Sequence, residues 1–497
     1  MPTTSADTLA LLADRVPSGL FIGGQWSRDV SGRATRAISV IDPGTGSPMG
    51  ELTDAAEADV DAAVDAAAAA WTRWRTMPAE DRAALLALLA DLVERDSELI
   101  AMIDSVDNGK PYVAAAGHDV PNAVATLRYY ARAAASVPAR TAEPVFATRG
   151  TRSVRVSRVP LGVVASIIPW NAPFMMAVWK LAPALAFGNT VVLKPAEDTS
   201  LSALYLGKLV QEAGFPAGVV NVITGRGATT GAALVRHPGV RKISFTGSTE
   251  VGREILAQSA VDFRRVGLEL GGKSATILFA DAARVDLKRA VTTAVWAMFV
   301  NAGQVCSAGS RLLIEASVHD EVLAALVGAV ERIRIGYGME KTTQLGPLVS
   351  QAQRDRVHGH VLAPTVGELM TGGKPLDRDG FFYPPTVVSG VGRDDALWTE
   401  EVFGPVLSVA AFDDADHAVA LANDSQYGLA AGLITTDDEL AARVASRLEV
   451  GTVWVNTHNV YDPAVPWGGM KQSGIGREIG SSAIGAYTEE QVLWLAG

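Results

Sequence analysis

The chain contains one cysteine, Cys306, and its neighbours are typical of a nucleophile. It stands in GQVCSAG, residues 303–309, among glycine, glutamine and serine. A thiolate is a strong nucleophile once its pKa is lowered, and small neighbours let a substrate approach closely. The alternative is a small buried hydrophobic residue, which is the commoner role of a lone cysteine. The polar, glycine-rich surroundings favour a functional turn.

Two other side chains have the chemistry to assist such a thiol. Glu269 ends the apolar run in LELGGKS beside two glycines. A carboxylate in that setting has a raised pKa and can act as a general base, although a hydrogen-bonded structural role is the alternative. Asn171 lies in PWNAP, where its amide could donate to an oxyanion or could simply form a turn between prolines.

Two glycine-containing segments are candidates for contact with a nucleotide phosphate. Gly225 and Gly227 are followed by Gly231, one residue too late for G-x-G-x-x-G, so this match is weak. FTGSTEVG, residues 245–252, follows an apolar strand and opens an expected helix. Its glycines, Gly247 and Gly252, allow a tight turn. Ser248 and the backbone N–H groups after it could meet a phosphate, or the serine could only cap the helix.

KPAE, residues 194–197, ends the apolar strand NTVVLK. Ligands of open α/β sheets bind at the carboxyl ends of strands. There Glu197 could accept from two ribose hydroxyls and would repel a 2′-phosphate, while Lys194 could hold a hydroxyl or phosphate. The alternative is a solvated Lys–Glu pair in a loop.

The composition excludes several classes of protein. The chain has 497 residues, 48% of them hydrophobic and 20% charged, with 43 Lys and Arg against 54 Asp and Glu, for a net charge of −11. This apolar content excludes intrinsic disorder, and the single cysteine excludes an internal disulfide framework. The acidic balance is evidence against a general nucleic-acid surface, so no nucleic-acid partner is expected.

An uncharged stretch, residues 159–179, has the length of a membrane span. Pro160, Pro169 and Pro173 would break a spanning helix repeatedly, so we predict a buried strand, a turn and then a helix over residues 174–187. No secretory signal is visible at the N-terminus. We therefore expect a cytoplasmic protein with no membrane partner.

The remaining pattern predicts an α/β fold. Apolar β-rich runs alternate with helix-compatible stretches through the middle of the chain, and a second set follows Cys306, including a helix over residues 322–335. This alternation is typical of parallel sheets covered by helices on both faces. The spacing of leucines also predicts one amphipathic helix over residues 79–103. Two α/β units are expected, with a hinge at Gly271 and Gly272.

Two segments are typical of strands at a sheet edge. Residues 151–158, TRSVRVSR, alternate polar and apolar side chains, and the C-terminal QVLWLAG is short and apolar. Uncovered edge strands invite pairing with another chain. These strands therefore predict assembly into an oligomer.

In their order along the chain, these segments resemble the aldehyde dehydrogenase superfamily, from FIGGQW near Phe21 to AYTEEQV near the end. Each motif is modest alone, but eight in register make coincidence implausible. The motifs are PWNAP, KPAE, FTGSTEVG, LELGGKS, GQVCSAGSR, EEVFGPV (residues 400–406), GTVWVN and PWGGMKQSGIGRE (residues 466–478).

The resemblance implies an organisation for the chain. A Rossmann-like NAD-binding domain would comprise residues 1–137 and 161–271, and an α/β catalytic domain residues 272–475. A small β oligomerisation element would comprise residues 138–160 and 476–497, giving a homodimer or homotetramer. NAD is the implied cofactor, with NADP as the alternative, and no metal site is implied.

The resemblance also implies roles for individual residues. Cys306 corresponds to the nucleophile, Asn171 with the Cys306 N–H to the oxyanion donors, Glu269 to the base that activates water, and Glu478 to a second carboxylate that relays protons. The reaction would proceed through a thiohemiacetal, hydride transfer to NAD and a thioester that water hydrolyses. The residues implied in cofactor binding are Trp170, Lys194, Glu197, Gly247, Ser248, Gly252, Glu401 (nicotinamide ribose) and Phe403 (nicotinamide).

The substrate segments depart from the commonest pattern of the family. Ala172 and Val300 replace aromatic residues, and Trp467 stands where phenylalanine is frequent. The first two changes should open or reshape the tunnel. Together with Met175, Met176 and Trp179, and with no arginine in these segments, they predict an apolar or aromatic aldehyde rather than a semialdehyde carrying a carboxylate.

Three other functions remain open at this level. An acylating relative would pass the thioester to coenzyme A, which Glu269 disfavours because a water-activating base fits hydrolysis. A cysteine hydrolase without nicotinamide would need a base such as histidine, and of seven histidines only His458 lies near a motif. A binding protein that retained the fold is the third alternative.

Overall fold

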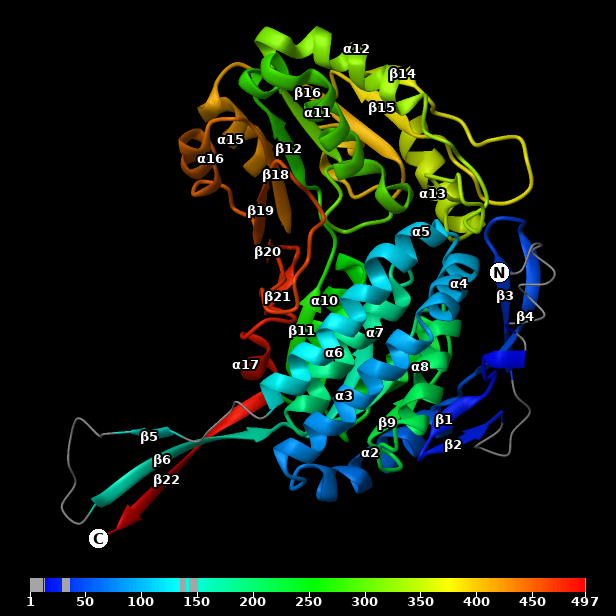
Figure 1. Ribbon diagram of the computed structural model, residues 1–497, viewed down its shortest axis with the longest axis vertical. Coiled ribbons are helices and arrows are strands. Elements are labelled where there is room, and N and C mark those ends of the chain that lie inside the picture. The colour runs from blue at the N-terminus through cyan, green and yellow to red at the C-terminus, as the bar shows by residue number, and fades with distance from the viewer. Residues whose placement is uncertain (1–11, 13, 29–35, 135–139, 143–150, 497) are drawn as a thin grey trace.

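A computed structural model describes residues 12, 14–28, 36–134, 140–142 and 151–496. It has two lobes, one above the other, and an arm that projects from the lower one (Figure 1). We call the lobe built on an eight-stranded sheet the first lobe and the lobe built on a seven-stranded sheet the second lobe. The three-stranded sheet that projects is the arm.

The sheet of the first lobe has five parallel strands at its centre and antiparallel strands at both ends. The central strands are apolar and buried, as expected for strands covered on both faces. In spatial order the strands are β2 (Gln25–Ser27), β1 (Leu20–Ile22), β9 (Val220–Val222), β8 (Thr190–Lys194), β7 (Val163–Ile167), β10 (Val240–Thr246), β11 (Arg265–Glu269) and β21 (Gly474–Ile475).

Helices cover both faces of this sheet because neighbouring residues of each strand point to opposite sides. Val191 and Leu193 of β8 join one apolar cluster, whereas Val192 joins another. The first cluster includes residues of α3 (Ala79–Arg95), α4 (Ser97–Asn108), α6 (Val120–Ala134), α7 (Pro173–Ala186) and α8 (Leu201–Glu212). The second includes residues of α2 (Glu57–Trp74), α9 (Ala232–Arg236) and α10 (Thr249–Ser259).

The single helix predicted over residues 79–103 is wrong: α3 ends at Arg95 and α4 begins at Ser97. Asp96 between them has φ −100° and ψ 17°, outside the helical range. Its carboxylate accepts hydrogen bonds from Arg95 and from the Tyr205 hydroxyl at 2.7 Å. The apolar spacing continues across the break because both helices bury a face, so the sequence pattern hides it.

The second lobe contains six parallel strands and one antiparallel edge strand, β14. In spatial order its strands are β14 (Glu368–Thr371), β15 (Thr386–Ser389), β16 (Val406–Phe412), β13 (Arg311–Glu315), β12 (Ala275–Leu278), β18 (Ala430–Ile434) and β19 (Thr452–Val455). Its helices include α11 (Ala280–Phe299), α12 (His319–Val330), α13 (Gln351–Leu362), α15 (Ala415–Asn423) and α16 (Asp438–Ala445). The predicted α/β class is confirmed, although the helix expected over residues 322–335 is α12, which begins and ends earlier.

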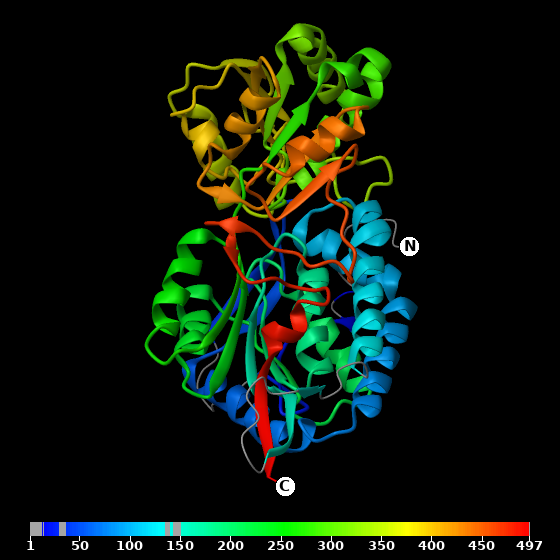
Figure 2. The same ribbon diagram turned by 90° about the vertical axis from the view of Figure 1, so that its left-hand side faces the viewer.

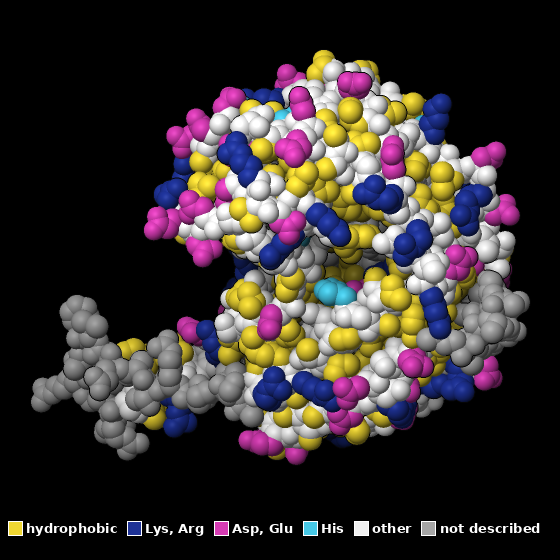
Figure 3. Space-filling view, turned by 45° about the horizontal axis from the view of Figure 1, so that its top comes forward, with side chains coloured by type: hydrophobic (Ala, Val, Ile, Leu, Met, Phe, Trp, Pro, Cys, Tyr) yellow, Lys and Arg dark blue, Asp and Glu magenta, His cyan; other side chains and the backbone are white. Residues whose placement is uncertain are grey.

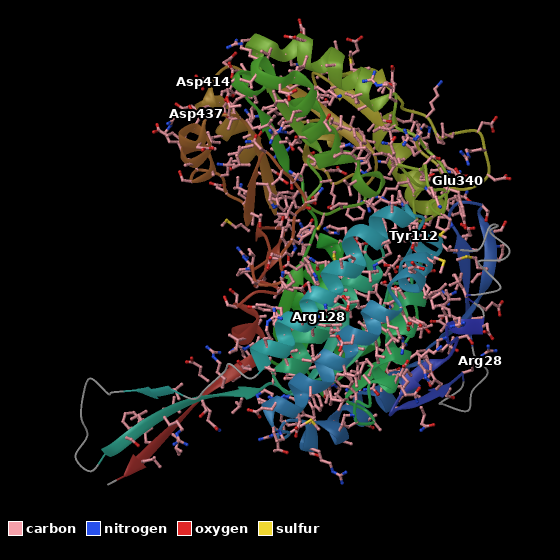
Figure 4. All side chains as sticks on the ribbon, viewed as in Figure 1. Arg28, Tyr112, Arg128, Glu340, Asp414 and Asp437 are labelled. Carbon is pink, nitrogen blue, oxygen red and sulfur yellow. The ribbon has the colours of Figure 1, made fainter. Side chains whose placement is uncertain are left out.

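The lobes meet along a seam, and Figure 2 shows the chain crossing between them. The backbone N–H of Tyr112 donates to the Gly338 carbonyl at 2.8 Å. Tyr112 lies at this seam in Figure 4, which also labels Glu340 there. Loops of the two lobes therefore lie next to each other along this seam.

The arm consists of β22 (Thr488–Ala496), β6 (Thr151–Pro160) and β5 (Arg140–Ala142), in that spatial order. The two segments expected to be edge strands therefore pair with each other, antiparallel, from Thr488 opposite Pro160 to Ala496 opposite Thr151. Residues 135–139 and 143–150, within the predicted oligomerisation element and its border, lie outside the described residues.

The uncharged stretch at residues 159–179 forms β7, a turn and the start of α7, as its prolines predict. Within the described part of the chain, no helix has the length and apolar content to cross a membrane.

Candidate active site

A cavity of about 280 Å³ lies where the two lobes meet, and Figure 3 shows the surface hollowed there. Its wall includes Cys306 and Asn171 together with the side chains that were predicted to form an apolar tunnel. The lining residues are Lys110, Ala114, His118, Asp119, Asn171, Ala172, Met175, Met176, Trp179, Val300, Asn301, Val305, Cys306, His458, Asn459, Tyr461 and Trp467.

Cys306 is brought to the cavity by a tight turn after α11. Asn301 and Ala302 have φ values of 49° and 55°, and Gly303 has φ 70°. A Cβ on Gly303 would lie 2.4 Å from the Gly404 carbonyl oxygen, so only glycine fits. Positive φ at non-glycine residues is strained and concentrates at functional sites. The turn holds the thiol half-buried at the cavity wall.

Asn171 approaches the cysteine loop from the other lobe. Its Nδ2 donates to the Gln304 carbonyl at 3.0 Å, and Asn301 Nδ2 donates to the Asn171 carbonyl at 3.0 Å. The Gln304 side chain is itself held, because its Oε1 accepts from the Val349 N–H at 3.0 Å. These bonds place the Asn171 amide beside the loop that carries Cys306.

The thiol of Cys306 is protonated at neutral pH. Burial, together with the smaller effect of the Glu401 and Glu269 carboxylates, which repel a thiolate, raises its pKa to about 12. A reaction at this sulfur therefore requires a base to take the proton or a change of surroundings that stabilises the thiolate.

Glu269 lies at the end of β11, buried behind the cavity wall rather than lining it. Its Oε2 has no hydrogen-bond partner among the described residues. Burial raises the pKa of this carboxyl well above its usual range, and the nearby charge of Glu478 adds to the rise, while Lys180 and Arg477 oppose it. A buried carboxyl with a high proton affinity and a free oxygen has the properties of a general base.

Glu478 is part of a buried polar network beside Glu269. Its Oε1 contacts the ammonium of Lys180 and accepts from Ser244 Oγ at 3.0 Å. The Lys180 ammonium also donates to Ser244 Oγ at 3.2 Å. Sequence reasoning missed Lys180. The signal was present, since it is the only charged residue between Arg158 and Lys194.

Lys194 and Glu197 lie together at the carboxyl end of β8. The buried Lys194 ammonium donates to the Pro195 carbonyl at 2.8 Å and is 3.5 Å from Glu197 Oε2. Burial lowers the pKa of Lys194. Glu197 Oε1 accepts from the Gly227 N–H at 3.1 Å, at the start of the helical turn η2 (Gly227–Gly231). The weak glycine motif therefore borders Glu197.

The predicted phosphate loop lies at the N-terminus of α10. Ser248 caps this helix, because its Oγ accepts from the Val251 N–H at 3.3 Å. The capping role weighed as an alternative for Ser248 is therefore present. Gly247 donates its N–H to the Glu269 carbonyl at 3.0 Å, and a Cβ on Gly252 would lie 2.5 Å from the Leu270 side chain.

Glu401 lies against Gly271 and Gly272, and the nearby Phe403 packs against Trp170. Glu401 Oε1 accepts from the Gly272 N–H at 2.9 Å, and a Cβ on Gly271 would lie 2.3 Å from Glu401 Oε2. Burial raises the pKa of Glu401 to about 7. The Phe403 ring meets the Trp170 ring edge-on, with centroids 5.1 Å apart.

His458 does not serve Cys306 as a base in this arrangement. Its Nε2 bonds to the Ser307 carbonyl oxygen at 2.9 Å, and burial lowers its pKa to about 4. The imidazole is therefore neutral and occupied by the backbone. This geometry disfavours the cysteine-hydrolase alternative, which needs a histidine bonded to the thiol.

The cavity is less uniformly apolar than predicted. Met175, Met176, Trp179 and Val300 line it as expected. Polar residues that sequence reasoning did not select line it too. Among them are Lys110, whose ammonium is ion-paired with Asp119 Oδ2, and His118, whose Nδ1 lies 2.9 Å from Asp119 Oδ1. Their placement depends on the docking of η1 (Ala115–Asp119) against the cavity, which no local pattern predicts.

Comparison with known proteins gives consistent matches over nearly the whole chain. The model of the "Aldehyde dehydrogenase family" matches residues 30–493. Phenylacetaldehyde dehydrogenase of Pseudomonas fluorescens is 44% identical, over 97% of this chain and 96% of the relative, and human retinal dehydrogenase 2 is 43% identical, over 95% and 90%. An NAD+ complex of aldehyde dehydrogenase from Bacillus cereus superposes with a TM-score of 0.94 at 40% identity, covering 99% of each chain.

Proposed function

This chain belongs to the aldehyde dehydrogenase family, and on that premise we propose how its residues oxidise an aldehyde. The protein is an NAD-dependent aldehyde dehydrogenase, which converts an aldehyde to its carboxylic acid. One observation supports the roles that we propose for individual residues: Cys306 and Asn171 reach the same cavity from opposite lobes.

In the proposed first step, the Cys306 thiol gives its proton to solvent water and its sulfur attacks the aldehyde carbon, forming the oxyanion of a thiohemiacetal. Asn171 Nδ2 and the Cys306 backbone N–H stabilise the oxyanion that develops. The bond from Asn171 Nδ2 to the Gln304 carbonyl supports this role because it holds the amide beside the nucleophile loop. Fixed donors of this kind require no reorganisation as charge develops.

In the proposed second step, hydride loss leaves a thioester on Cys306, and water hydrolyses it. Glu269 takes the proton from that water, and its unpartnered Oε2 and raised pKa support the assignment. Glu478 relays protons, and its contacts with Lys180 and Ser244 connect it to a buried polar network. Hydrolysis by this route distinguishes the protein from an acylating relative.

NAD accepts the hydride when it is bound, and several features fit its parts. Glu197, fixed by the Gly227 N–H, would accept from the adenosine ribose, with Lys194 beside it. The N-terminus of α10, with Gly247, Ser248 and Gly252, would hold the pyrophosphate. Glu401 would hold the nicotinamide ribose, and Phe403 and Trp170 would contact the nicotinamide. Glu197 favours NAD over NADP because it would repel a 2′-phosphate.

These roles follow a division of the chain that we propose with them. Residues 1–137 and 161–271 bind NAD, and residues 272–475 carry the nucleophile. Residues 138–160 and 476–497 join subunits into a homodimer or homotetramer. Support for the last assignment is the free edge of β22 and the exposure of its apolar side chains.

The substrate we propose is an apolar or aromatic aldehyde. The methionines at 175 and 176, Trp179 and Trp467 give the cavity an apolar and aromatic wall. The relative from Pseudomonas fluorescens, named for phenylacetaldehyde, points to the same class. A cytoplasmic location is also proposed, because a reducing compartment keeps a catalytic thiol free.

The test is oxidation of phenylacetaldehyde by the pure protein with NAD. Reduced nicotinamide should appear together with phenylacetic acid, without coenzyme A. Cys306→Ala should abolish both signals. Glu269→Gln should retain a burst of about one reduced nicotinamide per subunit and then turn over slowly, because the thioester accumulates.

Glu321→Gln provides the matched control, since Glu321 is an exposed carboxylate on α12 away from the cavity. It should behave as wild type. Full activity in Cys306→Ala would contradict the proposed chemistry. An acyl-CoA as the main product, when coenzyme A is added, would instead favour the acylating alternative.

A further inference from the structure

Three polar side chains form a hydrogen-bonded cluster beside the nucleophile. Ser307, the residue after Cys306, donates from Oγ to Asn459 Oδ1 at 2.7 Å. Ser307 Oγ also lies 2.7 Å from the Tyr461 hydroxyl oxygen. Asn459 and Tyr461 line the cavity, where most of their neighbours are apolar. The cluster is therefore a polar element in the substrate site that the proposed chemistry does not use.

The direction of each hydrogen bond can be assigned by counting protons. Asn459 Nδ2 lies 3.4 Å from the Ala297 carbonyl as donor, so Oδ1 is the acceptor that faces Ser307. The single hydroxyl proton of Ser307 goes to this oxygen. Tyr461 then donates to Ser307 Oγ, and because its Oη also lies 3.5 Å from Asn459 Oδ1 as a donor, its one proton stays within the cluster. Both hydroxyl protons are used within the cluster, and Tyr461 Oη keeps only acceptor capacity.

The Tyr461 ring is held rigidly at the cavity wall. It meets the Trp467 ring at 4.9 Å and the Trp179 ring at 5.7 Å, both nearly edge-on. The backbone carbonyl oxygen of Tyr461 accepts a hydrogen bond from Asn122 Nδ2 at 3.2 Å. Burial raises the pKa of the phenol, so it stays neutral at working pH. A fixed neutral acceptor among aromatic rings favours a ligand with both an apolar body and one donor.

Asp119, the carboxylate that lines the cavity, is already occupied. Both carboxylate oxygens of Asp119 have partners, Oδ2 the ammonium of Lys110 and Oδ1 the His118 ring. A substrate donor that reached Asp119 would have to displace one of them. Tyr461 Oη can accept a further bond without breaking any contact within the cluster.

We propose that Tyr461 Oη accepts a hydrogen bond from a hydroxyl group of the substrate, so that the enzyme prefers hydroxylated aromatic aldehydes. This inference rests on the proposed oxidation of aromatic aldehydes in the same cavity. Tyr461 is a specificity residue here, with Ser307 and Asn459 fixing the direction of its proton.

The first test uses the wild-type enzyme with NAD and phenylacetaldehyde, its ortho-, meta- and para-hydroxy derivatives, and the matching methoxy derivatives. One hydroxy isomer should have a kcat/KM roughly 3–10-fold above the parent, the range expected for one neutral hydrogen bond. The matching methoxy compound, which lacks the donor, should gain nothing. No advantage for any hydroxy isomer would overturn the proposal.

The second test repeats the comparison in Tyr461→Phe, which removes the acceptor and keeps the ring. The ratio of hydroxy to parent kcat/KM should fall to about 1. Tyr129→Phe makes the same chemical change outside the cavity lining and should keep the wild-type ratio. An advantage that persists in Tyr461→Phe would overturn the role of Tyr461.

The two proposals fail in different ways. If phenylacetaldehyde itself is not oxidised while aliphatic aldehydes are, the aromatic part of the proposed substrate class is wrong. If phenylacetaldehyde is oxidised but hydroxylation brings no advantage, only the role of Tyr461 is wrong. The wild-type comparison decides between these outcomes even if Tyr461→Phe does not fold.

Discussion

At the scale of single residues, the site combines the proposed nucleophile, whose thiolate is disfavoured, with a fixed amide that we propose receives negative charge. The pKa of Cys306 is about 12, and two neighbouring carboxylates contribute to the rise. Asn171 is already held beside the nucleophile loop. The chemistry therefore depends on groups that stabilise charge as the reaction proceeds rather than on a preformed thiolate.

Alkylation of Cys306 should report its raised pKa directly. With no other cysteine in the chain, iodoacetamide labelling detected by mass spectrometry reports this thiol alone. Because the thiolate fraction rises about tenfold per pH unit below the pKa, the rate constant should rise about tenfold per unit from pH 7 to pH 9 in the NAD-free protein. If the alkylation rate constant reaches a plateau between pH 7 and pH 9, the pKa of Cys306 is lower than this.

Asn171→Ala should lower kcat by about 10²–10³ because one oxyanion donor is lost. NAD binding, followed by fluorescence titration, should be unchanged, since no cofactor contact is assigned to this side chain. The melting temperature shows whether the loop contact to Gln304 matters for folding. If KM rises while kcat stays unchanged, Asn171 binds the ground state of the substrate instead.

At the scale of elements, the ends of strands and helices carry the side chains that we propose bind the cofactor. Lys194 ends β8, Glu269 ends β11 and Ser248 begins α10. Parallel strands bring their carboxyl ends to one edge of the sheet. Residues distant in sequence therefore gather there without any direct sequence signal between them.

Glu197 should determine the choice between NAD and NADP. Glu197→Gln keeps the size of the side chain but removes the charge that would repel a 2′-phosphate. The ratio of kcat/KM for NAD to that for NADP should fall roughly tenfold, equivalent to about 1.4 kcal/mol. Steady-state kinetics with both cofactors measure it, with Glu321→Gln as the control. An unchanged ratio would show that Glu197 does not face the ribose.

At the scale of the whole molecule, the arm presents an apolar surface that the described chain leaves uncovered. Val492, Leu493 and Trp494 of β22 are 52%, 48% and 55% exposed. They alternate between the two faces of the strand, and β22 is also the edge of its sheet. Such an edge invites pairing with another chain.

Trp494→Glu should therefore shift the assembly towards monomer. Light scattering at micromolar concentration should give the mass of a homodimer or homotetramer for wild type and a lower mass for the variant. Glu321→Gln, a charge change at an exposed position of α12 outside the arm, should leave the mass unchanged. A wild-type monomer would contradict the proposed assembly.

The sequence by itself determined the α/β class, the order of motifs and the segment that carries the proposed nucleophile, because these depend on local composition and periodicity. Only the tertiary structure decided that Asn171 meets the Cys306 loop, that Lys180 pairs with Glu478, and that the helix expected over residues 79–103 breaks at Asp96. The first two are contacts between elements that are remote in sequence. At the helix break, Asp96 accepts a hydrogen bond from the distant Tyr205. They form only when sheets, helices and lobes dock, and no local pattern encodes that docking.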